Sequence, residues 1–305
     1  MLNRFILIAL CSATFLGAQT AAPKTFATPE EARDTLVQAA ASGLDAVRAM
    51  LGPGADDIVR TGDPVMDKNL LDRFNQRIKE KAQLAPWEFN PDRITLSIGN
   101  DDFPFAVPLI RKNGRWHWDV QEGKLEVRNR VIGEDELDTI QTCLGYVAAQ
   151  QQYAEQDRTG KGVRQYATKL VSSPGKKDGL YWPGEDSPVA EGFAKAAAEG
   201  YSAPTGAGNP FHGYHFKILT GQGASAFGGA RDYTVHGLMI GGFGLVAWPA
   251  VYGVSGIKTF IVNQDGVVYE KDLGPQTATL AKAMTRFNPD KTWDESPDQD
   301  DTDLQ

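Results

Sequence analysis

The first part of the chain carries apolar side chains at the spacing of amphipathic helices. Thr28 precedes Pro29, and Glu31 follows three positions after the threonine. Threonine is a good N-cap, proline fits the first helical turn, and a glutamate at this spacing closes a capping box. A second helix is predicted to begin at Asp63-Pro64. The apolar positions that recur at helical spacing are Ala32, Leu36, Val37, Ala40, Leu44, Val47, Leu51, Met66, Leu70, Leu71, Phe74 and Ile78.

The pattern changes to alternation after position 90. Ile94, Leu96 and Ile98 alternate with polar residues, which predicts a half-buried strand. Asn113-Gly114 separates two further runs and is a strong signal for a tight β-hairpin. Helices followed by a curled antiparallel sheet resemble the cone-shaped nuclear-transport-factor-2-like (NTF2-like) and cystatin-like modules. This resemblance covers about residues 25–125 and implies an N-terminal α+β module.

The middle of the chain predicts one long helix. Acidic residues at 134–136 favour the positive end of a helix. Residues 126–133 are predicted to form a charged bridge into this helix, and two short helices are expected near 163–171 and 188–199. The apolar stripe of the long helix, which we assign to the core, is formed by Leu137, Ile140, Leu144, Val147 and Ala148.

The last part of the chain predicts an antiparallel meander that begins at Tyr214. Asn263-Gln-Asp-Gly266 separates its last two strands and has the composition of a turn. A final helix over 275–287 would cover one face of the sheet. The predicted fold class is therefore α+β, with a long helix packed on a meander in the second part. The predicted strand segments are 214–218, a run that begins with Tyr233 and Val235, 243–248, 257–262 and 267–270.

The first 22 residues have the composition of a secretory signal peptide. Arg4 gives a positive start, an apolar run follows from Phe5, and small residues surround positions 18–22. A membrane anchor needs about 18 or more apolar residues, and polar residues interrupt this run. A cleaved signal is therefore favoured over an anchor. The mature protein is predicted to be periplasmic or secreted, with no membrane span after signal removal.

Removal of the signal would leave Cys143 as the single thiol of an exported chain. No intramolecular disulfide is then possible in the oxidising space outside the cytoplasm. Cys143 is predicted to be buried and inert, and pairing between two chains is the alternative. The stability of the protein is expected to come from core burial.

The formal net charge of −8 is concentrated at the C-terminal end. Seven acidic residues and one lysine lie from Asp290 onward, which predicts a disordered acidic tail. The remaining chain is nearly neutral and has no basic cluster of the kind that nucleic-acid binding needs, so no nucleic-acid partner is predicted. The predicted organisation is a signal peptide (1–22), an N-terminal α+β module (23–128), a helix-plus-sheet domain (129–288) and the tail (289–305).

Most motifs that would carry chemistry are missing. The sequence has no His-Glu-x-x-His, no Cys-x-x-Cys and no phosphate-binding loop. His212 and His215 lie three apart on a segment predicted to be extended, so their side chains point to opposite faces and no metal site is predicted. Ser255 falls short of a nucleophile elbow because Ile257 replaces its last glycine. No cofactor is predicted, and the glycines of 241–244 are expected to admit a close backbone approach.

Asp232 and His236 are the candidate catalytic residues. Four positions apart on a strand, they would share one face, and a carboxylate can orient an imidazole for general base catalysis. A solvated strand face gives the same pattern. Tyr233, Trp248 and Tyr252 lie near this pair in the sequence and are candidate binding residues.

Asn263 and Asp265 are two further candidate binding residues. Their side-chain oxygens are of the type that calcium prefers. Two oxygen ligands are too few to predict a calcium site, and a turn explains the same residues.

Three long strings carry a family resemblance: DYTVHGLMIGGFGLVAWPAVYGVSGIKTFIVNQDGVVYEKDLG, RNRVIGEDELDTI and GYHFKIL. With these strings the chain resembles the domain of unknown function 2950 family, which consists of secreted proteins of Gram-negative bacteria. The resemblance covers nearly all of the mature chain. It implies a location and an architecture, and it transfers no catalytic residue.

The helix ELDTIQTCLGYVAAQQQYA, followed by GYHFKI and TFIVNQDGVVY, is similar to the globular heads of type II secretion pseudopilins. Such heads pack a long helix across an antiparallel sheet. Pilins need about 20 apolar residues at their mature N-terminus, whereas a whole predicted module precedes this helix. Assembly as a pilus subunit is therefore not expected, even if the fold is shared.

These features support one leading function and two alternatives. The leading hypothesis is an exported, non-enzymatic envelope protein that binds an envelope protein or ligand through the aromatics and glycines of 248–256. The first alternative is a periplasmic hydrolase that uses His236 with Asp232. The second is an accessory factor of a secretion or pilus system. A non-enzymatic role is favoured over an enzyme.

Overall fold

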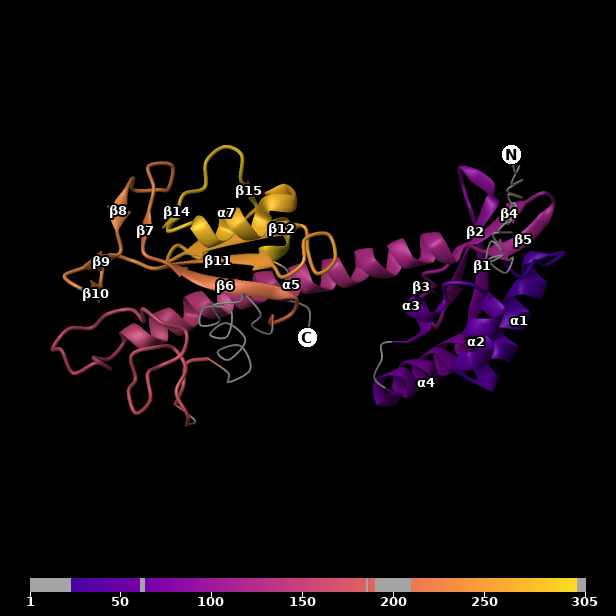
Figure 1. Ribbon diagram of the computed structural model, residues 1–305, viewed down its shortest axis with the longest axis horizontal. Coiled ribbons are helices and arrows are strands. Elements are labelled where there is room, and N and C mark those ends of the chain that lie inside the picture. Colours follow the sequence, from indigo (N-terminus) through magenta and orange to yellow (C-terminus); the bar gives the residue numbers. More distant parts are fainter. Residues whose placement is uncertain (1–22, 61–63, 185, 190–209, 301–305) are drawn as a thin grey trace, which may run out of the picture. The chain divides into compact units, whose positions relative to one another are not determined.

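The structure is a computed structural model that describes residues 23–60, 64–184, 186–189 and 210–300 (Figure 1). The protein belongs to the α+β class, as predicted, because it combines helices with several mainly antiparallel sheets. The chain divides into two compact units between Val127 and Arg128. The division falls within α5 (Val120–Ala154), a helix of 35 residues.

The first unit packs helices against an antiparallel sheet of five strands, in which β1, β2, β4 and β5 are neighbours in that order and β3 pairs with β2. Its helices are α1 (Pro29–Ser42), α2 (Leu44–Leu51), α3 (Asp56–Val59) and α4 (Pro64–Glu80). Its strands are β1 (Ala82–Trp87), β2 (Asn90–Ile98), β3 (Phe103–Pro104), β4 (Leu109–Lys112) and β5 (Arg115–Trp118).

The local sequence signals of this unit are confirmed. The Glu31 N–H donates to Thr28 Oγ1 at 3.1 Å, and the Ala27 N–H donates to Glu31 Oε2 at 2.7 Å. The threonine therefore caps α1, while the glutamate reaches back to the chain just before the cap. Asn113 and Gly114 have φ angles of 52° and 75°, which is the geometry of a type I′ hairpin turn between β4 and β5.

The core of the first unit lies between the helices and the sheet. Ile94, Leu96 and Ile98 are all buried, as the alternation predicted. Leu70 of α4 is 40% exposed, so its predicted burial is wrong. The apolar residues at helical spacing form a wider face on α4 than the part that is buried against the rest of the unit. The short β1 strand, which includes Pro86 and pairs with β2, is not among the predicted strands.

The predicted bridge at 126–133 is helical, which corrects the expected start of the long helix. The helix begins at Val120, because Asp119 Oδ1 accepts the backbone N–H groups of Gln121 and Glu122 and thereby caps it. The charged residues of 126–133 are mostly good helix formers, and nothing in this segment ends the helix.

The second unit is built on a five-stranded antiparallel sheet in the order β15-β13-β12-β11-β6. A small three-stranded sheet (β14-β7-β8) and a hairpin (β9 and β10) accompany it. The strands are β6 (Tyr214–Leu219), β7 (Gly221–Gln222), β8 (Arg231–Asp232), β9 (Thr234–Val235), β10 (Leu238–Met239), β11 (Gly244–Pro249), β12 (Lys258–Asn263), β13 (Tyr269–Asp272), β14 (Arg286–Phe287) and β15 (Asp294–Glu295). The remaining helices are η1 (Gly274–Gln276), α7 (Thr277–Ala283) and η2 (Pro297–Asp300).

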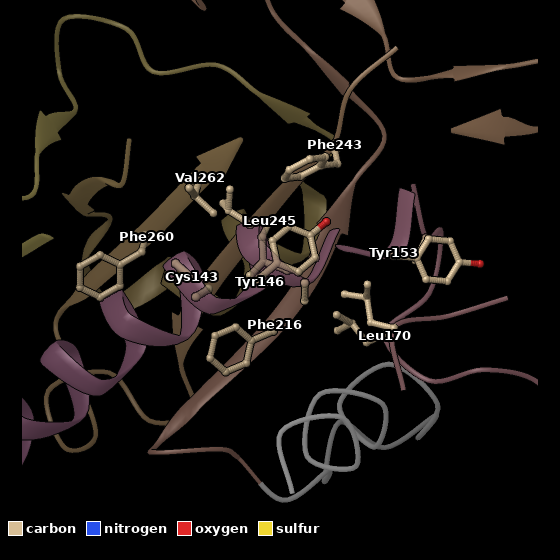
Figure 2. Packing of buried hydrophobic residues seen from close by; sticks show 14 of the residues in the cluster. Cys143, Tyr146, Tyr153, Leu170, Phe216, Phe243, Leu245, Phe260 and Val262 are labelled. Carbon is tan, nitrogen blue, oxygen red and sulfur yellow. The ribbon is translucent and has the colours of Figure 1, made fainter. Parts of the chain in front are cut away.

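The main sheet of the second unit has an apolar cluster on each face. The helix α5 packs on one face, where Cys143, Tyr146, Phe216 and Phe260 lie together (Figure 2). Ile140 and Val147 of the predicted stripe are buried there, whereas Ala148 is exposed, so its predicted core position is wrong. Cys143 is fully buried, as predicted, and burial raises the pKa of its thiol to about 12. On the other face, α7 covers a smaller cluster that includes Trp248. The long helix α5 thus packs on the antiparallel sheet of this unit.

The predicted helix at 163–171 is wrong. The segment is held in an irregular form by partners from other elements: the Tyr166 N–H donates to Met239 O at 2.8 Å, and the Ala167 N–H donates to Gln150 Oε1 at 2.8 Å. Val171 forms a bridge with Tyr181. Tertiary hydrogen bonds therefore override the local helical pattern. Most of the predicted helix at 188–199 lies outside the described residues.

The C-terminal segment differs from the prediction in two ways. The helix α7 ends at Ala283, where Lys217 Nζ donates to the carbonyls of Lys282 and Met284, both at 2.6 Å, and the chain then pairs with β7 as β14. The predicted disordered tail is wrong for its described part, because β15 pairs with β13 and the Ser296 N–H donates to Val268 O at 2.9 Å. The acidic composition of this segment predicted disorder and gave no sign of the strand pairing.

Replacing Thr259 with valine is expected to stabilise the protein by about 1 kcal/mol. Thr259 is fully buried, and its hydroxyl has no hydrogen-bond partner within the described residues. An apolar side chain of the same shape removes the cost of that buried hydroxyl. Thr277 is the matched control: it is 1% exposed, but its hydroxyl donates to Gly274 O at 2.6 Å, so Thr277→Val is expected to destabilise. Urea unfolding curves measure both, and a loss of stability in Thr259→Val would contradict the prediction.

Candidate functional site

The predicted catalytic residues, Asp232 and His236, lie on separate short elements. Asp232 belongs to β8, and Arg286 Nη2 donates to its Oδ1 at 2.5 Å. His236 is exposed and sits in the turn between β9 and β10 with a φ of 50°. Residues 232–236 therefore do not form the continuous strand that the prediction required. In the described part of the chain, no hydrogen bond or ion pair joins the two side chains.

Tyr233 and Trp248, two candidate binding residues, are buried. Tyr233 is fully buried, its hydroxyl donates to Gln222 Oε1 at 3.1 Å, and burial raises its pKa to about 12. A Cβ on Gly242 would lie 2.8 Å from the Tyr233 ring, so this glycine admits the close approach that the sequence predicted. Trp248 is 4% exposed and belongs to the cluster under α7. Both side chains support the fold, and neither presents a surface to a ligand.

Of the other three candidate binding residues, Asn263 ends β12, Asp265 lies in the turn that follows, and Tyr252 forms an isolated bridge with Gly256. The Tyr252 hydroxyl donates to Asp272 Oδ1 at 3.0 Å. Asn263 Nδ2 donates to Asp265 Oδ2 at 2.9 Å, and the Asp265 N–H donates to Asn263 Oδ1 at 3.1 Å. With Gly266 at a φ of 80°, these contacts form the turn that the sequence predicted. The side-chain oxygens of Asn263 and Asp265 therefore accept hydrogen bonds from within this turn.

A different part of the second unit forms a cleft with a volume of about 400 Å³, which we call the α5 cleft. One wall is the surface of α5, and the other is formed by residues 188–189 and 211–212. The lining combines polar and apolar groups. It includes Asp138, Gln141, Tyr146, Val189, Phe211 and His212.

The α5 cleft contains a carboxylate–imidazole pair. His212 Nδ1 lies 2.7 Å from Asp138 Oδ2, and the two side chains are 44% and 43% exposed. The ring of Phe211 meets the imidazole edge-on, with centroids 4.2 Å apart. His212 has a φ of 44°, an uncommon conformation that costs of order 1 kcal/mol and persists only where the surroundings fix it. Reciprocal backbone hydrogen bonds of 3.0 Å between Phe211 and Tyr214 close this turn, and the contact with Asp138 adds to the fixing.

Asp135, one helical turn before Asp138, extends the charge of this site. Its carboxylate lies directly against Gly213, where a Cβ would overlap it. Partial burial raises the pKa of Asp135, the charge of His212 opposes that shift, and the charge of Asp138 adds to it. Asp135, Asp138 and His212 therefore form one electrostatically coupled group, which we call the acid–imidazole cluster.

Glu136, the residue after Asp135, helps to hold the cluster in place. Its Oε1 accepts the backbone N–H groups of Ile257 at 2.8 Å and Lys258 at 2.9 Å. The Tyr214 hydroxyl donates to Lys258 O at 3.0 Å, and Gly256 leaves room for that ring. These contacts tie α5 to the start of β12 and to β6. Because His212 precedes β6 by two residues, they also set its position over α5.

The geometry of the α5 cleft suits recognition better than covalent catalysis. A carboxylate-held imidazole can exchange protons with a bound group. The neighbouring hydroxyl of Ser255 donates to Gly213 O at 2.8 Å and accepts the Val251 N–H at 3.1 Å, so it is committed to the backbone of its turn. Among the described residues, no three His, Cys, Asp or Glu side chains are arranged to hold a metal ion.

His212 was considered only together with His215, and this is not its partner in the structure. The actual partner, Asp138, lies on a helix in a distant part of the sequence. Periodicity within one element cannot report such a contact. One signal was available: Asp135, Glu136 and Asp138 belong to a string that carries the family resemblance, and Gly213 opens another.

The fold and the cleft define a two-unit α+β protein with a solvent-accessible cleft, lined by acidic and aromatic side chains, in its second unit. The chain belongs to the family described as "Protein of unknown function (DUF2950)", whose family model matches residues 23–296 and confirms the predicted family. No curated protein and no solved structure matches the chain. The expected likenesses to pseudopilin heads and to NTF2-like modules stay predictions. In the described ranges, no helix is both long and apolar enough to cross a bilayer.

Proposed function

We propose that the protein is an exported binding protein of the cell envelope and that the α5 cleft holds its ligand. The observation that carries this proposal is the Asp138–His212 pair, 2.7 Å apart, beside the apolar side chains of Phe211 and Val189 in a cleft of about 400 Å³. Clefts of this size with a few placed polar groups are typical small-ligand sites. The signal-like composition of residues 1–22 supports export.

The charges of the cleft favour one class of ligand. Asp138 brings a carboxylate to the lining of the cleft, Asp135 lies one helical turn before it, and Phe211 offers an aromatic ring in the same lining. Carboxylates near an aromatic surface attract ammonium and guanidinium groups. The expected ligand therefore carries a cationic or hydrogen-bond-donating group next to a short apolar part.

A thermal-shift screen of the mature protein tests this proposal. The screen uses basic amino acids, short basic peptides and envelope glycans, and a ligand that prefers the native state raises the unfolding midpoint. Asp138→Asn keeps the shape of the side chain and is expected to weaken binding about tenfold or more. Asp232→Asn is the control because that carboxylate lies outside the cleft, and it should leave the affinity unchanged. A screen without hits, or an unaffected Asp138→Asn variant, would refute the proposal.

A hydrolase that uses Asp232 and His236 receives no support from the geometry, because the two residues do not meet. A ligand found in the screen can be used to distinguish a binding protein from an enzyme. A binding protein returns the ligand chemically unchanged after long incubation, as mass spectrometry can measure. No contact of the described residues specifically favours an accessory role in secretion.

A further inference from the structure

Figure 1 shows the loop that joins β7 to β8. This loop carries one almost fully exposed aromatic side chain. Phe227 is 90% exposed, whereas its neighbour Ala226 is 5% exposed and belongs to the core cluster under α7. Gly228 and Gly229 follow with φ angles of 78° and 77°, which few other residues adopt readily. The buried alanine anchors the loop, and the two glycines turn the chain back directly after the phenylalanine.

A buried glutamine fixes the carbonyl groups around Phe227. Gln222 is fully buried, and its Nε2 donates to Phe227 O at 2.8 Å and to Gly229 O at 2.6 Å. Its Oε1 accepts the hydroxyl of Tyr233 at 3.1 Å. The amide of Gln222 therefore uses both its donor and its acceptor groups to hold the tip of the loop and to connect it to the core.

The base of the loop is bonded to the neighbouring strand β14 and the residue after it. The Gly223 N–H donates to Phe287 O at 2.8 Å, and the Ser225 N–H donates to Asn288 Oδ1 at 2.9 Å. The Gly229 N–H closes the loop on Ala226 O at 2.9 Å. A loop held at its base, at its tip and by a buried residue has little conformational entropy left to lose when it binds.

We propose that loop 223–230 is a docking element and that Phe227 inserts into an apolar pocket on a partner protein. Aromatic side chains that enter a pocket dominate many protein interfaces, and preorganised loops bind with a smaller entropic loss. Arg231 is exposed at the end of the loop, and its Nη1 lies 3.8 Å from where a Cβ on Gly228 would be. The pocket of the partner is therefore expected to have acidic side chains at its rim.

A protein pocket explains the loop better than a lipid surface does. The other residues of 223–230 are glycine, alanine and serine, so Phe227 is the only large apolar side chain that the loop offers. Burying one phenylalanine strengthens association by about 10- to 150-fold. A single acyl chain, with far more apolar surface, already gives only marginal membrane binding.

Photo-crosslinking in the producing cell identifies what the loop touches. The benzophenone amino acid p-benzoylphenylalanine replaces Phe227 and, in a matched control, Phe89, which is 86% exposed in the first unit. A discrete adduct with one other protein is expected at position 227 and not at position 89. An adduct with lipid, an adduct between two copies of this chain, or no adduct would each overturn the proposal.

The partner protein that crosslinking identifies is then purified on its own, and its affinity for variants of this chain tests the role of the Phe227 side chain. Phe227→Ala is expected to weaken binding at least 30-fold, while Phe89→Ala changes it less than twofold. Gln222→Leu keeps Phe227 but frees the loop, and we expect a fivefold or greater loss. If Phe227→Ala binds as tightly as the natural chain, the proposal is wrong. Because Phe227 is exposed, that variant is expected to fold normally, and circular dichroism checks this.

Discussion

Replacing Gly256 with alanine is expected to lower the free energy of unfolding of the second unit by about 3 kcal/mol. A Cβ at Gly256 would lie 2.5 Å from Cζ and 2.7 Å from Cε2 of Tyr214, with the tyrosine oxygen closer still. The ring cannot move away easily, because Tyr214 is fully buried and its hydroxyl donates to Lys258 O at 3.0 Å. Urea unfolding followed by circular dichroism measures the loss.

Two variants show whether this overlap is the cause. Gly133 lies inside α5, and a Cβ at this position would meet no atom of another element within 4 Å, so Gly133→Ala is expected to stabilise the protein by up to about 1 kcal/mol. Tyr214→Phe removes the oxygen that a methyl at Gly256 meets first. The double variant Gly256→Ala/Tyr214→Phe should therefore lose less stability than the sum of the losses in Gly256→Ala and Tyr214→Phe. Strictly additive losses would contradict the overlap.

The sequence predicted the elements whose causes are local. The cap of α1 needs only Thr28 and Glu31, and the β4–β5 hairpin needs only Asn113-Gly114. Most of the α5 stripe and four strands of the main sheet (β6, β11, β12 and β13) were also predicted, because the spacing of apolar residues indicates which face of a helix or strand is buried. These features depend on contacts within a few residues or on a repeated pattern.

The sequence did not predict the elements that depend on distant partners. The segment 163–171 has helical spacing, but the side chain of Gln150 and the backbone of Met239 hold it in another form. The described part of the acidic tail has the composition of a disordered segment, yet β15 adds a strand beside β13. Neither set of contacts produces a repeating pattern of apolar and polar residues in the sequence.

The candidate site shows the same division. Asp232 and His236 were predicted as a pair because an acid and an imidazole four residues apart on one strand would share a face. The pair in the structure, Asp138 with His212, joins α5 to the residues that precede β6. The three strings that carry the family resemblance meet here, since Glu136, Tyr214 and Gly256 pack together. The strings were informative about this location, although no single one of them contains the pair.

Glu136 and Gln150 are polar residues of α5 that bind the backbone of distant segments, and they explain why this helix organises the second unit. Glu136 binds the N–H groups at the start of β12. Gln150, further along the same helix, binds the segment around Ala167. Each of these side chains makes the hydrogen bonds that the bound backbone groups would otherwise make in a strand or helix. The structure around each segment therefore depends on one residue.

Gln150→Leu is therefore expected to cost about 3 kcal/mol of stability. Gln150 is fully buried, its Nε2 donates to Ala167 O at 2.9 Å, and its Oε1 accepts the Ala167 N–H at 2.8 Å. Leucine fills nearly the same volume but leaves both backbone groups of Ala167 buried without these partners, and Ala167 is only 1% exposed. Urea unfolding gives the loss of stability.

Hydrogen exchange locates the effect of Gln150→Leu. The amide of Ala167 is expected to lose its protection, while amides of the main sheet, such as that of Phe260, exchange at rates set only by the lower global stability. Gln151→Leu is the matched control, because Gln151 is the exposed neighbour on the same helix and should change stability by less than about 0.5 kcal/mol. If Gln150→Leu unfolds at the same urea concentration as the natural chain, the segment around Ala167 is held by other contacts, and the helix does not organise the second unit through this side chain.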